Sequence, residues 1–223
     1  MAAEKEAVER KAVWAALRDI HQDPLYTFPW ILEQDRQVKK AEPIYFVKRT
    51  RGRGYDYPQY CLHGRDWRRL KHMLRHNNVY LGVHGSYYGS IPAIEYSKMY
   101  RAHYLRCSIE QLQRLADAGY TEDFTMGFAD QAGFRLQTCR AVRWINPKTM
   151  QLTNLTLHPL MVMDTTLSKY MHLTEDEAYF LCERLIAKVK LHHGDLCLLW
   201  HNNNFAGESY HRALYPKILA LIK

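Results

Sequence analysis

The chain has 223 residues, of which 47% are hydrophobic and 24% are charged. This usage is typical of a globular protein with a buried core, and it excludes a disordered or fibrous chain. No apolar run approaches the roughly 18 residues that a membrane helix needs, and the first residues lack the apolar core of a signal peptide. The five cysteines are scattered and never spaced as CxxC, which favours a reducing compartment. We therefore expect a cytoplasmic protein without a membrane span.

The formal net charge of +8 is concentrated in one section of the chain. Residues 36–76 hold 12 of the 31 Lys and Arg residues but only 3 of the 23 Asp and Glu residues. Such a section could meet phosphate or an acidic polymer, so nucleic-acid binding is one hypothesis. No motif that reads DNA or RNA accompanies it. We therefore expect a solvated basic surface and no nucleic-acid partner.

The first half of the chain is predicted to alternate helices and strands. Residues 1–22 form an N-terminal helix region, with an amphipathic helix over residues 3–20, and Pro24 begins a second helix. The apolar and β-branched runs at residues 44–47 and 79–84 are typical of strands, and a helix through Leu70 and Leu74 lies between them.

The second half repeats this alternation. Ser108 is a predicted N-cap, and Thr174 and Glu177 have the spacing of a capping box. The pattern predicts helices over residues 108–118, 174–193 and 209–222 and strands over residues 152–157 and 196–200. Strands that alternate with helices favour an α/β layer or barrel with mostly parallel strands. We expect one such domain over residues 23–223.

Ionisable side chains follow several of the predicted strands. His84 and His201 each end a strand and are followed by small polar residues, and Asp164 follows the apolar run 160–163. Because sites in parallel α/β folds lie at the carboxyl ends of strands, these positions indicate a metal or acid–base site. A purely structural role for each histidine stays open.

Successive segments of the chain resemble motifs of the NodB-homology polysaccharide deacetylases. A mostly bacterial branch of that superfamily is more similar still. The segments stand in the family's order and read GVHGSY at 82–87, RAHYLR at 101–106, AGY at 118–120 with Asp123, GFR at 133–135, PLMVMDTTL at 159–167 and LLWHN at 198–202. The resemblance covers roughly residues 23 to 220. It implies a distorted (β/α) barrel and metal-dependent hydrolysis of an N-acetyl or O-acetyl group on a sugar or glycan.

The resemblance also implies roles for individual residues. His84 and His103 would hold a divalent metal, zinc or a similar ion. His201 would be the general acid, Asp123 would tune it, and Arg101 would orient the carboxylate base. Asp164 is placed in the catalytic pocket. The residues implied to contact the substrate are Ser86, Tyr87, Tyr104, Arg135, Leu199, Trp200 and Asn202.

The chain departs from the family pattern at two places. Tyr88 stands where the second metal-binding histidine of the superfamily is expected, and the strand ending in an H-D-x-D pair is absent. We therefore expect a barrel that lacks its first strand, with an unpaired edge at residues 44–47. Two hypotheses follow. One is a deacetylase-like metal-dependent hydrolase, active or inactive for want of its aspartate pair. The other is a non-catalytic glycan-binding or interaction module on the same barrel.

Overall fold

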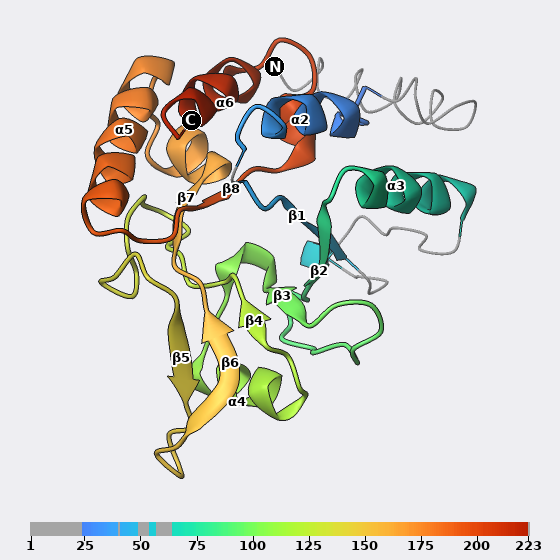
Figure 1. The fold of residues 1–223 in the computed structure, drawn as a ribbon, viewed down its shortest axis with the longest axis vertical. Helices are drawn as coiled ribbons and strands as arrows, with labels where there is room; N and C mark the ends of the chain where they lie inside the picture. The colour runs from blue at the N-terminus through green and yellow to red at the C-terminus, as the bar shows by residue number, and fades with distance from the viewer. Residues whose placement is uncertain (1–23, 40, 49–53, 57–63, 223) are drawn as a thin grey trace. The chain divides into compact units, whose positions relative to one another are not determined.

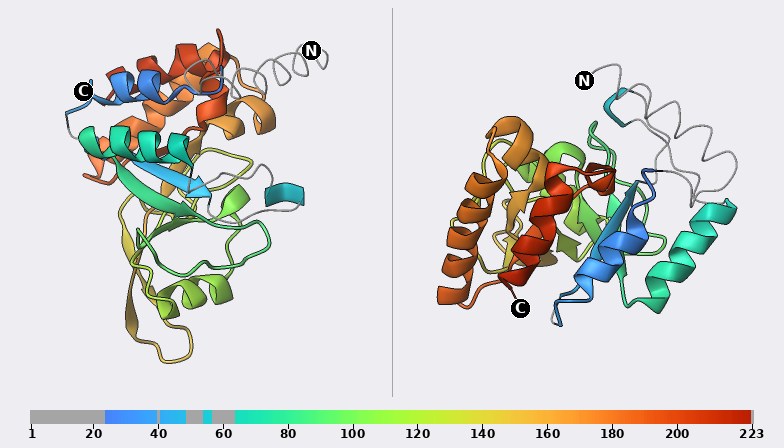
Figure 2. Two further views of the ribbon diagram at one scale, coloured as in Figure 1. Left: turned by 90° about the vertical axis from the view of Figure 1, so that its right-hand side faces the viewer. Right: turned by 90° about the horizontal axis from the view of Figure 1, so that it is seen from above.

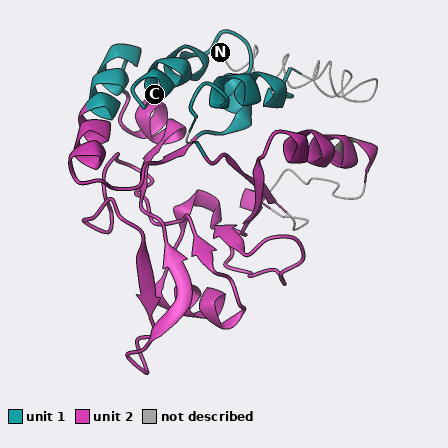
Figure 3. Cartoon of the chain, viewed as in Figure 1, with its two compact units in different colours: residues 1–41, 173–183, 200–223 teal, residues 42–172, 184–199 magenta. Residues whose placement is uncertain are grey.

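The chain folds into two compact units. The structure, a computed structural model, describes residues 24–39, 41–48, 54–56 and 64–222 (Figure 1). Unit 1 contains residues 1–41, 173–183 and 200–223, and unit 2 contains residues 42–172 and 184–199 (Figure 3). The expected helix over residues 3–20 lies outside the described residues. The assignment of residues 23–223 to one domain stays a prediction.

The larger sheet of unit 2 has six strands in the order β1-β2-β3-β4-β6-β5. Neighbouring strands are parallel from β1 to β6, and β5 runs antiparallel beside β6. The strands are β1 (Ile44–Lys48), β2 (Tyr80–His84), β3 (Met99–Arg101), β4 (Glu122–Asp123), β5 (Val142–Ile145) and β6 (Leu152–Leu157). The mainly parallel α/β architecture expected from the sequence is confirmed.

A second, two-stranded sheet pairs β7 (Leu160–Met163) with β8 (Cys197–Leu199) in parallel. All four residues of β7 are buried, in agreement with its continuous apolar sequence. Across the described residues the strands thus form two sheets and no closed barrel. The closed barrel and its missing first strand therefore stay predictions, although β1 does lie at an edge of the described sheet.

Two helices of unit 2 follow the sequence pattern closely. α3 (Arg65–His76) ends at Asn77, and α4 (Ile109–Asp117) begins after Ser108, whose Oγ accepts the Gln111 N–H at 3.2 Å. α4 contacts β6, and its Leu112 and Leu115 join a buried core cluster with Tyr100, Tyr120 and Leu155. The apolar face of α4 therefore packs against the part of the sheet that β3, β4 and β6 form.

Unit 1 is held together by aromatic side chains. α2 (Phe28–Asp35) and α6 (Tyr210–Ala220) lie side by side (Figure 2). The ring of Trp30 lies 5.0 Å from that of Phe205 and 6.4 Å from that of Tyr215, between centroids. The Tyr215 hydroxyl also donates to Asp35 Oδ1 at 2.6 Å. α2 begins at Phe28 rather than at Pro24, because Pro29 occupies its first turn instead.

The longest helix of the described ranges, α5 (Glu175–Leu191), has residues in both units. Its predicted capping box is confirmed. Thr174 N–H and Oγ1–H both donate to Glu177 Oε2 at 2.8 Å, and Glu177 N–H donates back to Thr174 Oγ1 at 3.3 Å. None of the helices in the described ranges has the length and apolar character needed to cross a bilayer.

Candidate functional site

The carboxyl ends of β1, β2 and β3 bring three basic side chains into one row. Lys48 is in register with His84, and His84 is in register with Arg101. On the next strand Asp123 pairs with Tyr100, one position before Arg101. Parallel pairing therefore brings His84, Arg101 and Asp123, together with Lys48, to the carboxyl edge of the sheet.

A carboxylate that no motif indicated lies beside this row. Asp56 ends a short 3₁₀ turn, η2 (Gly54–Asp56), and its side chain is buried. It accepts hydrogen bonds from Ser86 Oγ, from Tyr87 N at 2.8 Å and from His103 Nδ1 at 3.0 Å. Burial raises the pKa of Asp56, but these hydrogen bonds outweigh it and lower the pKa below its ordinary value of 3.8. Asp56 is therefore a charged carboxylate.

The turn is fixed from two further sides. Lys48 Nζ donates to the backbone oxygen of Asp56 at 2.8 Å, and burial lowers the pKa of Lys48. Gly54 has a φ of +55°, and a Cβ at this position would come within 2.7 Å of Tyr88 Oη. Glycine is favoured at the start of the turn, because it adopts this backbone conformation without strain and leaves room for the Tyr88 hydroxyl.

His84 and His103 lie together, with ring centroids 5.0 Å apart and planes at 78°. His84 Nδ1 faces the Gly85 carbonyl oxygen at 3.0 Å, and His103 Nδ1 faces Asp56. Because both partners only accept, each Nδ1 carries a proton, and a histidine with this proton and no other has its lone pair on Nε2. Burial, followed by the charge of Arg101, holds the pKa of His84 well below 6.5, so His84 is neutral.

Arg101 and Asp164, both in unit 2, interact electrostatically. The Arg101 guanidinium lies 4.4 Å from the centroid of the Phe46 ring. Burial lowers the pKa of Arg101 to about 10, and the charge of Asp164 opposes that shift. The Asp164 side chain is fully buried at the end of β7 and accepts the Thr165 N–H at 2.6 Å. The structure thus brings together two residues that the motifs place in the pocket.

Asp123 is buried in a polar network. Its Oδ1 accepts Thr125 N–H at 3.0 Å and its Oδ2 accepts Thr125 Oγ1–H at 2.7 Å, while Thr125 Oγ1 accepts Ala102 N–H at 3.0 Å. Burial raises the pKa of Asp123 to about 6 in spite of these hydrogen bonds. Asp123 is therefore a carboxyl group that changes charge near neutral pH.

Three tyrosine rings form a cluster beside His103. Tyr87 and Tyr104 are 5.5 Å apart between centroids, Tyr55 lies 4.5 Å from Tyr87, and Tyr104 lies 4.6 Å from His103. Tyr55 is 56% exposed and Tyr104 is 48% exposed. Exposed aromatic faces next to polar groups are suited to stacking on a sugar ring.

The described donors do not complete a metal site. His84 and His103 offer two ring nitrogens, but both oxygens of the nearest carboxylate, Asp56, already accept hydrogen bonds. Within the described ranges, no group of three or more His, Cys, Asp or Glu side chains is placed to hold a metal ion. The cation Lys48 also stands in register with His84. We therefore derive no step of the chemistry through a metal.

The remaining predicted residues divide between the units. Leu199 and Arg135 belong to unit 2, where Arg135 Nη1 donates to the Gly127 oxygen at 3.2 Å. Trp200, His201 and Asn202 belong to unit 1. Asn202 there accepts from Thr27 Oγ1 at 2.7 Å through its backbone oxygen and donates from its side chain to the Leu25 oxygen at 3.2 Å. The predicted partnership of His201 with Asp123 stays a prediction.

Sequence reasoning missed Asp56 and Lys48. Asp56 is the one acidic residue between Glu42 and Asp66, inside the most basic part of the chain. That isolation is the signal that could have found it. Neighbouring positive charges stabilise the charged form of an isolated carboxylate. In the structure, Asp56 accepts hydrogen bonds from several of the surrounding donors.

Comparison with known proteins identifies a related fold. A crystal structure of a "putative polysaccharide deacetylase" from Mycobacterium smegmatis matches the chain with a TM-score of 0.59 and 15% sequence identity. The match covers 98% of this chain and 79% of that protein. No protein-family model matches the sequence, and no curated protein matches it. The fold is therefore similar to that of the mycobacterial protein.

Proposed function

We propose that the chain is a deacetylase-like hydrolase that removes an acetyl group from a sugar at the carboxyl edge of β1–β4. Two observations support a carbohydrate substrate, namely the likeness in fold to the mycobacterial protein and the exposed tyrosines beside the histidines. The contact that carries the proposal is the 3.0 Å hydrogen bond between His103 Nδ1 and Asp56. With this hydrogen bond, His103 can act as a general base without a metal ion. The aspartate that serves as the base in the superfamily is absent from the motifs of this chain.

In the proposed reaction His103 is the general base. Asp56 holds the Nδ1 proton, so Nε2 takes a proton from a water molecule, and the developing imidazolium is stabilised by the carboxylate. The water oxygen forms a bond to the acetyl carbonyl carbon. The bond from that carbon to the sugar nitrogen then breaks, a proton passes to the leaving amine, and acetate is released. His103 Nε2 returns to that amine the proton that it took from water, and the role of His201 as general acid stays a prediction.

Acetate release from chitotetraose, an oligomer of N-acetylglucosamine, tests this proposal. We expect release by the untreated protein and by protein treated with EDTA, and its loss in His103→Gln. The exposed His72 on α3 gives a matched control, and His72→Gln should retain the activity. Release that disappears with EDTA and returns with Zn²⁺ would instead restore His84 and His103 to the metal-binding role that the motifs imply. Absence of release under every condition would refute the hydrolase.

The second candidate is a glycan-binding module without turnover. Lys48 favours this candidate, because it places a cation in register with His84 and so opposes a catalytic metal ion there. Binding of chitotetraose without acetate release, measured by calorimetry on the same samples, would select this candidate. The cytoplasmic location expected from the sequence stays a proposal.

A further inference from the structure

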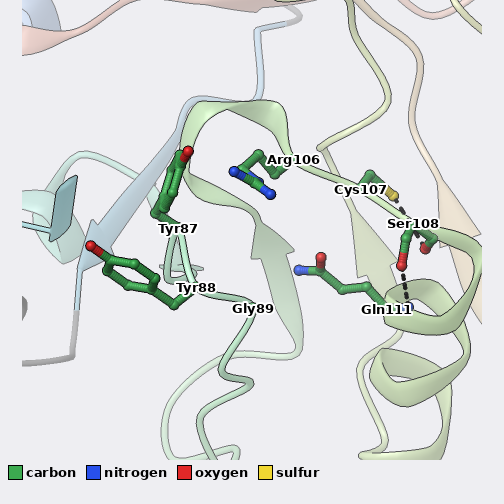
Figure 4. Close-up of a pocket in the computed structure, with 7 residues that line it drawn as sticks. All are labelled: Tyr87, Tyr88, Gly89, Arg106, Cys107, Ser108 and Gln111. Carbon is green, nitrogen blue, oxygen red and sulfur yellow. Dashed lines mark hydrogen bonds between the residues drawn. The ribbon is translucent and has the colours of Figure 1, made fainter.

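An open hollow of about 390 Å³ lies next to the tyrosines of the candidate site. Its lining includes Tyr87 and Tyr88, Arg106 against the Tyr87 ring, and Ser108 and Gln111 at the start of α4 (Figure 4). In Figure 4 the Arg106 guanidinium and the Gln111 amide point toward the same space. Aromatic rings opposite planar polar groups are a combination that suits a sugar, which has apolar ring faces and polar edges.

Arg106 is held in place without an acidic partner. Its guanidinium lies 4.3 Å from the centroid of the Tyr87 ring, an arrangement that orients the guanidinium plane. Among the side chains that the structure describes, none forms an ion pair with Arg106. A preoriented guanidinium with its hydrogen-bond donors unused by an acid is suited to bind a carboxylate with two parallel hydrogen bonds.

Tyr87 connects this hollow with the candidate site. Its N–H donates to Asp56 Oδ1 at 2.8 Å, and its ring lies 5.5 Å from that of Tyr104, the neighbour of His103. The ring of Tyr87 is therefore shared between the two places. A glycan that reaches His103 would set an adjoining sugar unit against Tyr87 and Arg106.

We propose that the hollow is a subsite for a carboxylate-bearing sugar, so that the natural ligand is an acidic glycan. Arg106 binds the carboxylate, and Tyr87 and Tyr88 contact the sugar ring. The proposal rests on the proposed function in one respect, namely that the chain binds a glycan at all. It adds that an acidic unit lies next to the acetylated unit.

Calorimetry with two tetrasaccharides tests the subsite. One probe is the hyaluronan tetrasaccharide, in which N-acetylglucosamine alternates with glucuronate, and the other is the neutral chitotetraose. We expect the acidic probe to bind about tenfold more tightly, the gain of one good charge-assisted contact. We also expect this preference to shrink as salt is added. Arg106→Gln should remove the preference and leave the affinity for chitotetraose unchanged.

Arg184, exposed on α5, provides the matched control, because Arg184→Gln removes the same charge away from the hollow. It should keep the preference. Equal affinities of the native chain for the two probes would overturn the subsite and leave the proposed function standing. So would equal weakening of both probes by Arg106→Gln in a protein with a native circular dichroism spectrum. Absence of binding to either probe would overturn both proposals together.

Discussion

His103 and Asp56, 47 residues apart in the chain, are joined by a hydrogen bond of 3.0 Å between Nδ1 and Oδ1. This bond fixes the orientation and the proton position of the imidazole. It does so from a short turn that is itself held by three donors from other parts of unit 2. The folded turn therefore determines the orientation of the imidazole that we propose as the general base.

Asp56→Asn should lower acetate release about 10- to 100-fold, the usual cost of removing a group that orients a functional histidine. An amide can still accept from Tyr87 N–H, so the turn should stay folded. The measurement is the rate of acetate release at saturating substrate, with circular dichroism as the check on folding. The exposed Asp130 gives the control Asp130→Asn, which should retain the native rate. A native rate in Asp56→Asn would show that His103 needs no carboxylate partner.

The stability of the protein should depend on Asp123 between pH 4 and pH 6. The pKa of this buried carboxyl is raised from 3.8 to about 6, so the folded state binds a proton more tightly than the unfolded state does. The contribution of Asp123 to stability is therefore fully present below pH 3.8 and declines as the pH rises through 6. The free energy of unfolding should fall by about 3 kcal/mol over this pH interval through Asp123.

Urea unfolding at a series of pH values measures this effect. The native chain should lose stability over that interval relative to Asp123→Asn, which has no proton to lose. Asp130→Asn should follow the native curve, because Asp130 is exposed. Parallel curves for the native chain and Asp123→Asn would contradict the raised pKa.

Gly85→Ala should destabilise unit 2 by about 1–3 kcal/mol, the cost of overpacking a core. A Cβ on Gly85 would come within 1.9 Å of the hydroxyl oxygen of Tyr100, a fully buried side chain. Gly89 makes an informative comparison, because it has a φ of +76° but open space around its Cβ position. Gly89→Ala should cost only about 1 kcal/mol through backbone strain. Free energies of unfolding from urea titrations would rank the two, and a smaller loss at Gly85 would refute the close approach.

Thr174→Ala should lower the free energy of unfolding by about 1 kcal/mol, because it removes the N-cap of α5. Thr174→Ser keeps the hydroxyl and should restore most of that loss. Thermal unfolding of the two variants and the native chain provides the measurement. Equal melting temperatures for Ala and Ser at this position would show that the capping box contributes nothing.

Local patterns predicted the elements of the fold well. Ser108 and Thr174 begin the helices that the sequence assigned to them, and the alternation at residues 152–157 is strand β6. The short strands β3 and β4 had no such signal, since two or three residues show no periodicity and form strands only because neighbours pair with them. The order of the strands likewise depends on contacts between distant segments.

The candidate site was predictable only in part. His84, Arg101 and Asp164 were predicted as site residues because they end strands or stand in motifs, and all three belong to unit 2. Asp56 stands in no motif, and its role depends on a hydrogen bond to a residue 47 positions away. Trp200 and His201 were predicted beside these residues and belong to unit 1, so their place in the site stays a prediction.

The turn at Gly54–Asp56 has a consequence for how such a chain would change under mutation. Ser86, Tyr87 and His103 all donate to the one carboxylate, and Lys48 fixes the backbone beside it. Removing that carboxylate would leave the buried Ser86 hydroxyl and the half-buried Tyr87 N–H and His103 Nδ1–H without their acceptor, which lowers stability unless another oxygen takes its place. A descendant that lost its activity would therefore still be selected to keep Asp56, whereas His103 would be free to drift. Among relatives of this chain, a histidine retained at the position of His103 is accordingly a better mark of a working site than the aspartate that orients it.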